Sequence, residues 1–132
     1  MAAPSGGRRE HATPGPLLAP DVLAEMDADF GDPAVVVRFV RDFRSILPSR
    51  VERLERRLDD GDPGGAEDAA LSLATSSAMV GAVRLERISR SVQHALEEDG
   101  LDAARRSLDP LRLCATETLG EMLRLWPDSA SS

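Results

Sequence analysis

Apolar residues recur every three or four positions along most of the chain, which is the spacing of one face of an α-helix. The longest run spans about residues 33–58. Its apolar members are Val36, Phe39, Val40, Phe43, Leu47, Val51, Leu54 and Leu58. β-branched and aromatic residues are few, and no useful stretch alternates with the period of two that a half-buried strand shows. The pattern therefore predicts an all-α fold.

Asp-Pro pairs precede three of the apolar runs, at Asp32-Pro33, Asp62-Pro63 and Asp109-Pro110. An aspartate at the N-cap accepts hydrogen bonds from the first free N–H groups of a helix. A proline at the first helical position gives up no hydrogen bond, because its N–H would have had no partner within the helix. Each pair therefore predicts a helix start. Pro48, inside the first long helix, predicts a kink rather than a stop.

The segments after the first long helix predict three more helical regions. One runs from Pro63 to about Val80, and the next from about Val83 to Glu98, where Gly100 ends it. Residues 101–126 predict either one helix kinked at Pro110 or a short helix followed by a longer one, with an inner face of Leu111, Cys114, Thr118, Met122 and Leu125. Four long helices with short connections predict an antiparallel four-helix bundle.

The ends of the chain differ in pattern from this bundle. Residues 21–30 predict a short additional N-terminal helix, with Leu23, Met26 and Phe30 on one face. Residues 1–19 are rich in Pro, Gly and Ala without a helical period, so we expect a flexible N-terminal tail. Residues 127–132 predict a second, shorter tail. The expected folded domain therefore covers residues 20–126.

Composition excludes several kinds of chemistry. A single cysteine closes no internal disulfide and supplies no thiolate zinc site. All 16 basic residues are arginines, so a P-loop lysine and a lysine Schiff base are both excluded. The net charge of −7 and the aromatic content of 3% disfavour binding to nucleic acid. The sequence implies no cofactor. A metal site formed by His94 with Glu97, Glu98 and Asp99 is not expected, because this acidic run is typical of a solvated helix end.

The same numbers bear on location and assembly. No stretch approaches the roughly 20 consecutive apolar residues that a membrane-spanning helix needs. We therefore expect a soluble cytoplasmic protein that does not bind a membrane. The acidic surface weakly disfavours self-association, which favours a monomer over an oligomer.

The second predicted helix carries a family resemblance. Residues 69–82 read AALSLATSSAMVGA, and Leu85 follows. This stretch resembles the pattern A-H-x-L-K-G-S-S-x-x-x-G-A-x-x-L of histidine-containing phosphotransfer (HPt) domains. The matching positions are Ala70, Leu73, Ser76, Ser77, Gly81, Ala82 and Leu85. The resemblance covers about residues 20–125 and implies a four-helix bundle that relays phosphoryl groups between receiver domains in bacterial two-component systems.

The chain departs from the family pattern at three positions of the active site. Leu71 stands where the family has its phosphorylated histidine, Ala74 where it has a lysine, and Thr75 where it has a glycine. The reaction needs an exposed imidazole as nucleophile and a nearby positive charge, neither of which leucine and alanine supply. The resemblance therefore implies a degenerate member without a catalytic residue, and not an enzyme.

The helical period places Ala66, Ala70, Leu73, Ser77 and Val80 on an inward stripe. Leu71, Ala74, Thr75 and Ala78 are expected on the face that carries the histidine in active relatives. Two interpretations are open. An exposed apolar patch on a polar bundle favours a docking surface, and the resemblance implies a receiver domain or a histidine kinase as the partner. Alternatively, Leu71 packs into a groove beside the neighbouring helix and binds nothing.

The remaining candidate residues support weaker hypotheses. His11 lies in the expected tail, where no scaffold holds it. His94 is expected to be exposed on the third long helix, and active phosphotransfer through it as a surrogate site is the first alternative function. A structural or dimerising bundle unrelated to signalling is the second, because small residues such as Ser77 and Gly81 also permit close helix packing. Cys114 is expected to be a small core residue.

Overall fold

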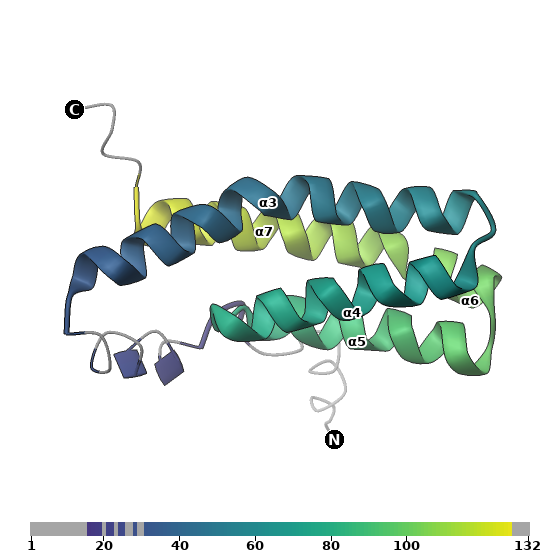
Figure 1. Ribbon diagram of the computed structural model, residues 1–132, viewed down its shortest axis with the longest axis horizontal. Coiled ribbons are helices and arrows are strands. Elements are labelled where there is room, and N and C mark those ends of the chain that lie inside the picture. Colours follow the sequence, from purple (N-terminus) through teal and green to yellow (C-terminus); the bar gives the residue numbers. More distant parts are fainter. Residues whose placement is uncertain (1–15, 20, 23, 26–27, 29–30, 128–132) are drawn as a thin grey trace, which may run out of the picture.

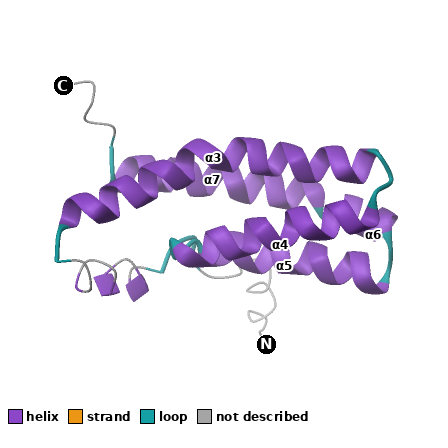
Figure 2. Cartoon of the chain, viewed as in Figure 1, coloured by secondary structure: helices purple, strands orange, loops and turns teal. Residues whose placement is uncertain are grey.

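The computed structural model describes residues 16–19, 21–22, 24–25, 28 and 31–127. Its helices are α3 (Pro33–Asp59), α4 (Pro63–Met79), α5 (Val83–Glu98), α6 (Leu101–Arg106) and α7 (Leu108–Leu125). Four of them run along the long axis of the molecule, while the short α6 lies at one end (Figure 1). No strand occurs in the described part of the chain (Figure 2). The predicted all-α bundle is confirmed.

The helix boundaries follow the capping chemistry of the sequence. The Asp32 side chain accepts a hydrogen bond from the N–H of Ala34 at 3.0 Å, and that of Asp62 accepts one from Gly65 at 2.9 Å. Both aspartates are therefore the N-caps that the Asp-Pro pairs predict. α3 continues across Pro48 without a stop, and its ribbon changes direction along its length (Figure 1).

The region after Gly100 is a short helix followed by a longer one, which was one of the two predicted arrangements. The break falls at Ser107, so Asp109 is not an N-cap and the prediction of a helix start at Asp109-Pro110 was wrong. Pro110 is tolerated in the first turn of α7, because the N–H groups there have no intrahelical partners. Leu108 is buried in the core, and its burial favours a helix that begins at Leu108, one residue before Asp109.

The core lies along the middle of the four long helices and is mostly aliphatic. Its largest fully buried side chains include Leu47, Leu54, Leu58, Leu73, Leu85, Leu111 and Met122. The inner faces predicted for α3 and α7 are therefore correct with one exception. Leu125 is exposed, because α7 ends at this residue and the following Trp126 packs against the core in its place.

The N-terminal segment is partly ordered against the bundle. Leu18 is buried in the core, and the N–H of Ala19 donates to the carbonyl of Gly81 at 2.7 Å. The prediction of a flexible tail was therefore wrong for residues 16–19. Burial of Leu18 and partial burial of Leu17 against the core hold this segment on the bundle. Residues 1–15 and 128–132 lie outside the described residues, as do Leu23, Met26 and Phe30. The described residues of segment 21–30 are helical.

The packing of the helices determines which faces remain open. α4 packs against α3 and α5, and α7 packs against the same two helices, so α4 and α7 lie diagonally across the bundle. The outer face of α4 is therefore open to solvent between two flanking helices. In the described ranges, no helix is both long enough and apolar enough to span a bilayer.

Candidate functional site

The outer face of α4 presents an exposed leucine, which Thr75 and Ala78 follow and the charged Glu67 and Asp68 precede. Leu71 is 42% exposed, Thr75 is exposed, and Ala78 is half-buried. These three side chains, called the Leu71 face below, repeat at spacings of four and three residues and so lie on one side of the helix. Leu71 is therefore partly covered by its neighbours and partly open to solvent.

Ala74 does not belong to this face. It is fully buried, so the expectation that it faces solvent was wrong. α4 is covered on two sides and therefore buries a wider arc than a single stripe, comprising Ala66, Ala69, Ala70, Leu73, Ala74 and Ser77. Ala74 lies on the edge of α4 that faces α5, as does Glu67, which interacts with Glu97 of α5. The predicted inward stripe is confirmed.

The opposite edge of α4 is bonded to α3 through an arginine. One guanidinium nitrogen of Arg50 (Nη1) donates to Ser72 Oγ at 2.5 Å and to Ser76 Oγ at 3.1 Å. Ser72 and Ser76 directly follow Leu71 and Thr75 in the sequence. The guanidinium is therefore held beside the Leu71 face, in a half-buried position on α3. This places one positive charge next to a surface whose own helix carries no basic residue.

Further arginines of α3 continue from Arg50. A groove on this helix is lined by Ser49, Arg50, Arg53, Arg56 and Arg57, and is called the arginine groove below. Arg57 lies 3.9 Å from Asp62. Sequence reasoning missed this groove. The available signal was the recurrence of Arg50, Arg53 and Arg57 at i, i+3 and i+7, which places three cations on one face.

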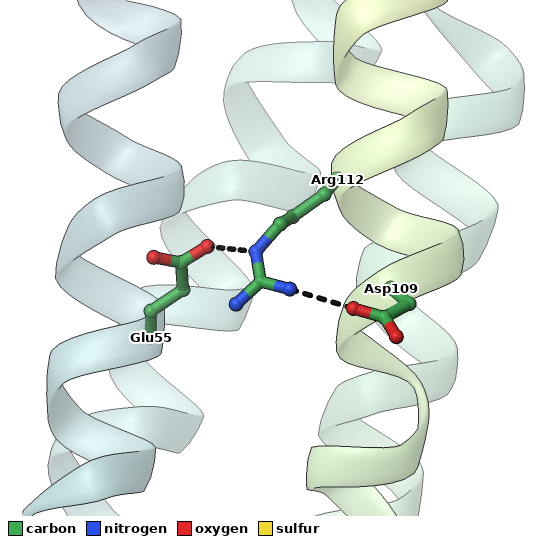
Figure 3. Close-up of polar contacts among 3 residues, drawn as sticks. All are labelled: Glu55, Asp109 and Arg112. Atoms are coloured by element: carbon green, nitrogen blue, oxygen red, sulfur yellow. Dashed lines mark hydrogen bonds and ion pairs between the residues drawn. The ribbon is translucent and has the colours of Figure 1, made fainter.

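A cross-helix ion pair fixes the other side of α3. Arg112 of α7 donates to Glu55 of α3 and, at 2.6 Å, to Asp109 one turn earlier on its own helix (Figure 3). The hydrogen bond that Arg112 donates to Glu55 is the main reason that the pKa of Arg112 lies above its usual value. Glu55 points toward α7, so the arginine groove is on the side of α3 that is turned toward α4 and solvent.

Two carboxyl groups meet between α4 and α5. The pKa of Glu67 is raised above 4.5, chiefly by the hydrogen bond that its carboxyl shares with Glu97, and further by burial and by the charges of Glu97 and Asp68. The folded protein therefore binds this proton more tightly than the unfolded chain does. The stabilisation is complete below the unfolded pKa and is lost as the pH rises through the higher, folded pKa.

Glu67→Gln is expected to raise the midpoint of thermal unfolding, Tm, at pH 7, because the neutral amide donates to Glu97 without repelling it. The gain should shrink as the pH falls through the raised pKa of Glu67, because the wild-type carboxyl then becomes protonated itself. Thermal unfolding followed by circular dichroism between pH 4 and 7 measures both values. Glu98→Gln removes the same charge from an exposed position on α5 and serves as the control. A gain of equal size in Glu98→Gln would contradict the assignment to this pair.

The other sequence candidates do not join the Leu71 face. The side chain of His94 is 73% exposed on α5, with its Nδ1 3.9 Å from Glu97 Oε1. Cys114 is buried and its pKa is raised, primarily by that burial, while a contact with Thr118 opposes the rise. This places Cys114 in the core as predicted. Within the described ranges, no three His, Cys, Asp or Glu side chains gather closely enough to hold a metal ion. His11 lies outside the described residues.

Comparison with known families identifies the same segment. The family model of the Hpt domain matches residues 38–125, which include α4, α5, α6, α7 and most of α3. Searches of curated proteins and of solved structures return no match to the chain. The matched range contains the Leu71 face and the arginine groove.

Proposed function

Because the chain belongs to the Hpt domain family, we propose that it acts in phosphorelay signalling as a pseudo-phosphotransfer module. Hpt domains are phosphotransfer modules that interact with receiver domains and histidine kinases. In this proposal the protein docks one of these partners over the Leu71 face and carries no phosphate there. The observation that carries the proposal is an exposed leucine at the register position of the family's phosphohistidine.

The chemistry at this position supports binding without transfer. A leucine side chain has no lone pair with which to attack phosphorus, so no phosphoryl–protein bond forms at residue 71. Ala74 is fully buried and uncharged at the position of the family's lysine. Thr75 adds an exposed side chain where the family has glycine, which holds a partner's active site further from the helix. All three differences act against the transfer reaction.

The surface that remains suits a protein partner. Leu71 is an exposed apolar side chain with Thr75 and Ala78 on its C-terminal side and the charged Asp68 on its N-terminal side. Exposed apolar anchors of this kind contribute strongly to protein interfaces. The position of α4 between α3 and α5 leaves this anchor accessible from outside the bundle. The partner is thus a receiver domain or a histidine kinase of the same signalling system.

Phosphoryl transfer tests the inactive half of the proposal. The protein is incubated with radiolabelled acetyl phosphate and with a labelled phosphoreceiver, and acid-labile protein-bound phosphate is measured. We expect no label on the wild-type chain. Label that persists in the Leu71→Ala variant and disappears in His94→Ala would overturn the proposal in favour of phosphotransfer through His94. Label lost from neither variant would overturn it as well.

Binding tests the other half. Receiver domains and kinase phosphotransfer domains from the source organism are titrated against the protein by isothermal calorimetry. We expect at least one to bind with 1:1 stoichiometry. If none binds, and sedimentation shows that the chain associates only with itself, a structural bundle unrelated to signalling is the correct function instead.

A further inference from the structure

We infer that the arginine groove of α3 is the part of the docking surface that recognises anions, and that it receives the phosphorylated, acidic site of a receiver domain. The inference rests on the proposed function and names the form of the partner that is bound. The protein would then select a phosphorylated receiver over an unphosphorylated one.

The first support is the position of the groove beside the Leu71 face. Arg50 is level with Ser72 and Ser76 of α4 through its hydrogen bonds. Arg57 is level with Gly65, because a Cβ added to that glycine would lie 3.0 Å from the arginine side chain. α3 and α4 run antiparallel (Figure 1), so Arg53 lies between these two levels, beside the turn of α4 that contains Leu71.

The second support is the state of the arginine side chains. Arg53 and Arg56 are exposed, and in the described part of the chain neither forms an ion pair or a hydrogen bond with another side chain. By contrast, Arg90, Arg105, Arg112 and Arg124 are all paired with carboxylates. In a protein of net charge −7, four arginines around one groove form a local cationic surface that attracts anions.

The third support is the chemistry of the guanidinium group. Its planar fork of N–H donors matches the oxygens of a phosphoryl group or a carboxylate, and it stays charged at every physiological pH. A receiver phosphorylated on aspartate presents both kinds of oxygen at one site. The arginines thus supply from α3 the positive charge that Ala74 cannot supply from α4. No bond is made or broken in this complex, and the phosphoryl group stays on the receiver.

A nucleic acid also presents phosphates, but the observations favour a protein. The chain has no lysine, the groove has no aromatic side chain on which a base could stack, and the overall charge repels a polyanion. The groove is also adjacent to the exposed Leu71. An apolar part of a receiver surface would bury this side chain, whereas the charged backbone of a nucleic acid would not.

The test compares two forms of the receiver that binds in calorimetry: unmodified, and activated with beryllofluoride as a stable mimic of phosphoaspartate. We expect the wild-type protein to bind the activated form about tenfold more tightly, which corresponds to about 1.4 kcal/mol, because the guanidinium groups form charge-assisted hydrogen bonds with the phosphoryl mimic. Arg53→Gln/Arg56→Gln should reduce this preference to twofold or less. Arg106→Gln/Arg124→Gln removes the same charge from α6 and α7 and should retain the preference.

The outcomes separate the two proposals. Equal affinity of wild-type protein for both receiver forms, or an undiminished preference in Arg53→Gln/Arg56→Gln, overturns the anion-recognition inference and leaves docking through Leu71 intact. Loss of preference in both double variants also overturns it, because total charge would then be the cause. Failure of every receiver and kinase to bind overturns both proposals. Arginine-dependent binding of a single-stranded oligonucleotide in place of a receiver overturns the inference as well.

Discussion

Gly81→Ala is expected to lower the free energy of unfolding by about 2–4 kcal/mol, which combines the cost of a left-handed backbone with that of overpacking. Gly81 has a φ of +74°, where a side chain is strained. An added Cβ would also lie 2.9 Å from the backbone carbonyl oxygen of Ala19 and 3.1 Å from Val22 Cβ. Because this oxygen is a backbone atom, no side-chain rotation can move it away, and the N-terminal segment as a whole must shift. Chemical denaturation with urea measures the loss.

Gly120→Ala provides a matched control with the opposite expected sign. Gly120 is exposed inside α7, its φ is negative, and a Cβ added there meets nothing within 4 Å. Alanine in a helix interior is more stable than glycine by up to about 1 kcal/mol. The unfolding midpoint should therefore rise. Equal destabilisation by both substitutions would show that the packing around Gly81 is not the cause.

Leu71→Asp is expected to weaken binding of the receiver or kinase partner about 30-fold or more. This corresponds to the loss of roughly 2 kcal/mol that marks a central apolar contact in an interface, since the carboxylate must be desolvated on docking. Folding should be unaffected, because the side chain is already 42% exposed. Calorimetric titration with the partner measures the affinity, and circular dichroism checks the fold.

Leu113→Asp is the control for this substitution. Leu113 is a leucine of α7 with 61% exposure, and α7 lies diagonally across the bundle from α4. Both variants replace an exposed leucine by an aspartate, but Leu113 lies on α7 and Leu71 on α4. Affinity should change less than twofold. If Leu113→Asp weakens binding as strongly as Leu71→Asp, the partner does not dock specifically over the Leu71 face.

The fold was largely predictable because its signals are local. Asp32 and Asp62 cap helices by contacts within three residues, and the apolar stripe of α3 follows directly from the helical period. The prediction failed at Asp109, where the same dipeptide signal was overridden by burial of Leu108. Local capping is worth about 1 kcal/mol, while burying a leucine side chain contributes somewhat more.

The site was predictable only in part, since its exposure depends on neighbouring helices. The period of α4 correctly placed Leu71 and Thr75 outside and Leu73 and Ser77 inside. It did not show that α5 covers Ala74, because the width of a buried arc depends on how many helices flank it. Nor did it bring Arg50 to Ser72 and Ser76, since that contact joins residues 22 and 26 positions apart.

The hydrogen bond from Ala19 to Gly81 makes the N-terminal segment a reporter on the turn that follows α4. The amide proton of Ala19 is protected from exchange with solvent only while the N-terminal segment is docked. The exchange rate of this proton therefore measures how often Leu18 leaves the core. The family match begins at residue 38, and a protein trimmed to that boundary would lack Leu18 and Val36 from the core. The unit that folds cooperatively is therefore longer than the unit that the family pattern identifies.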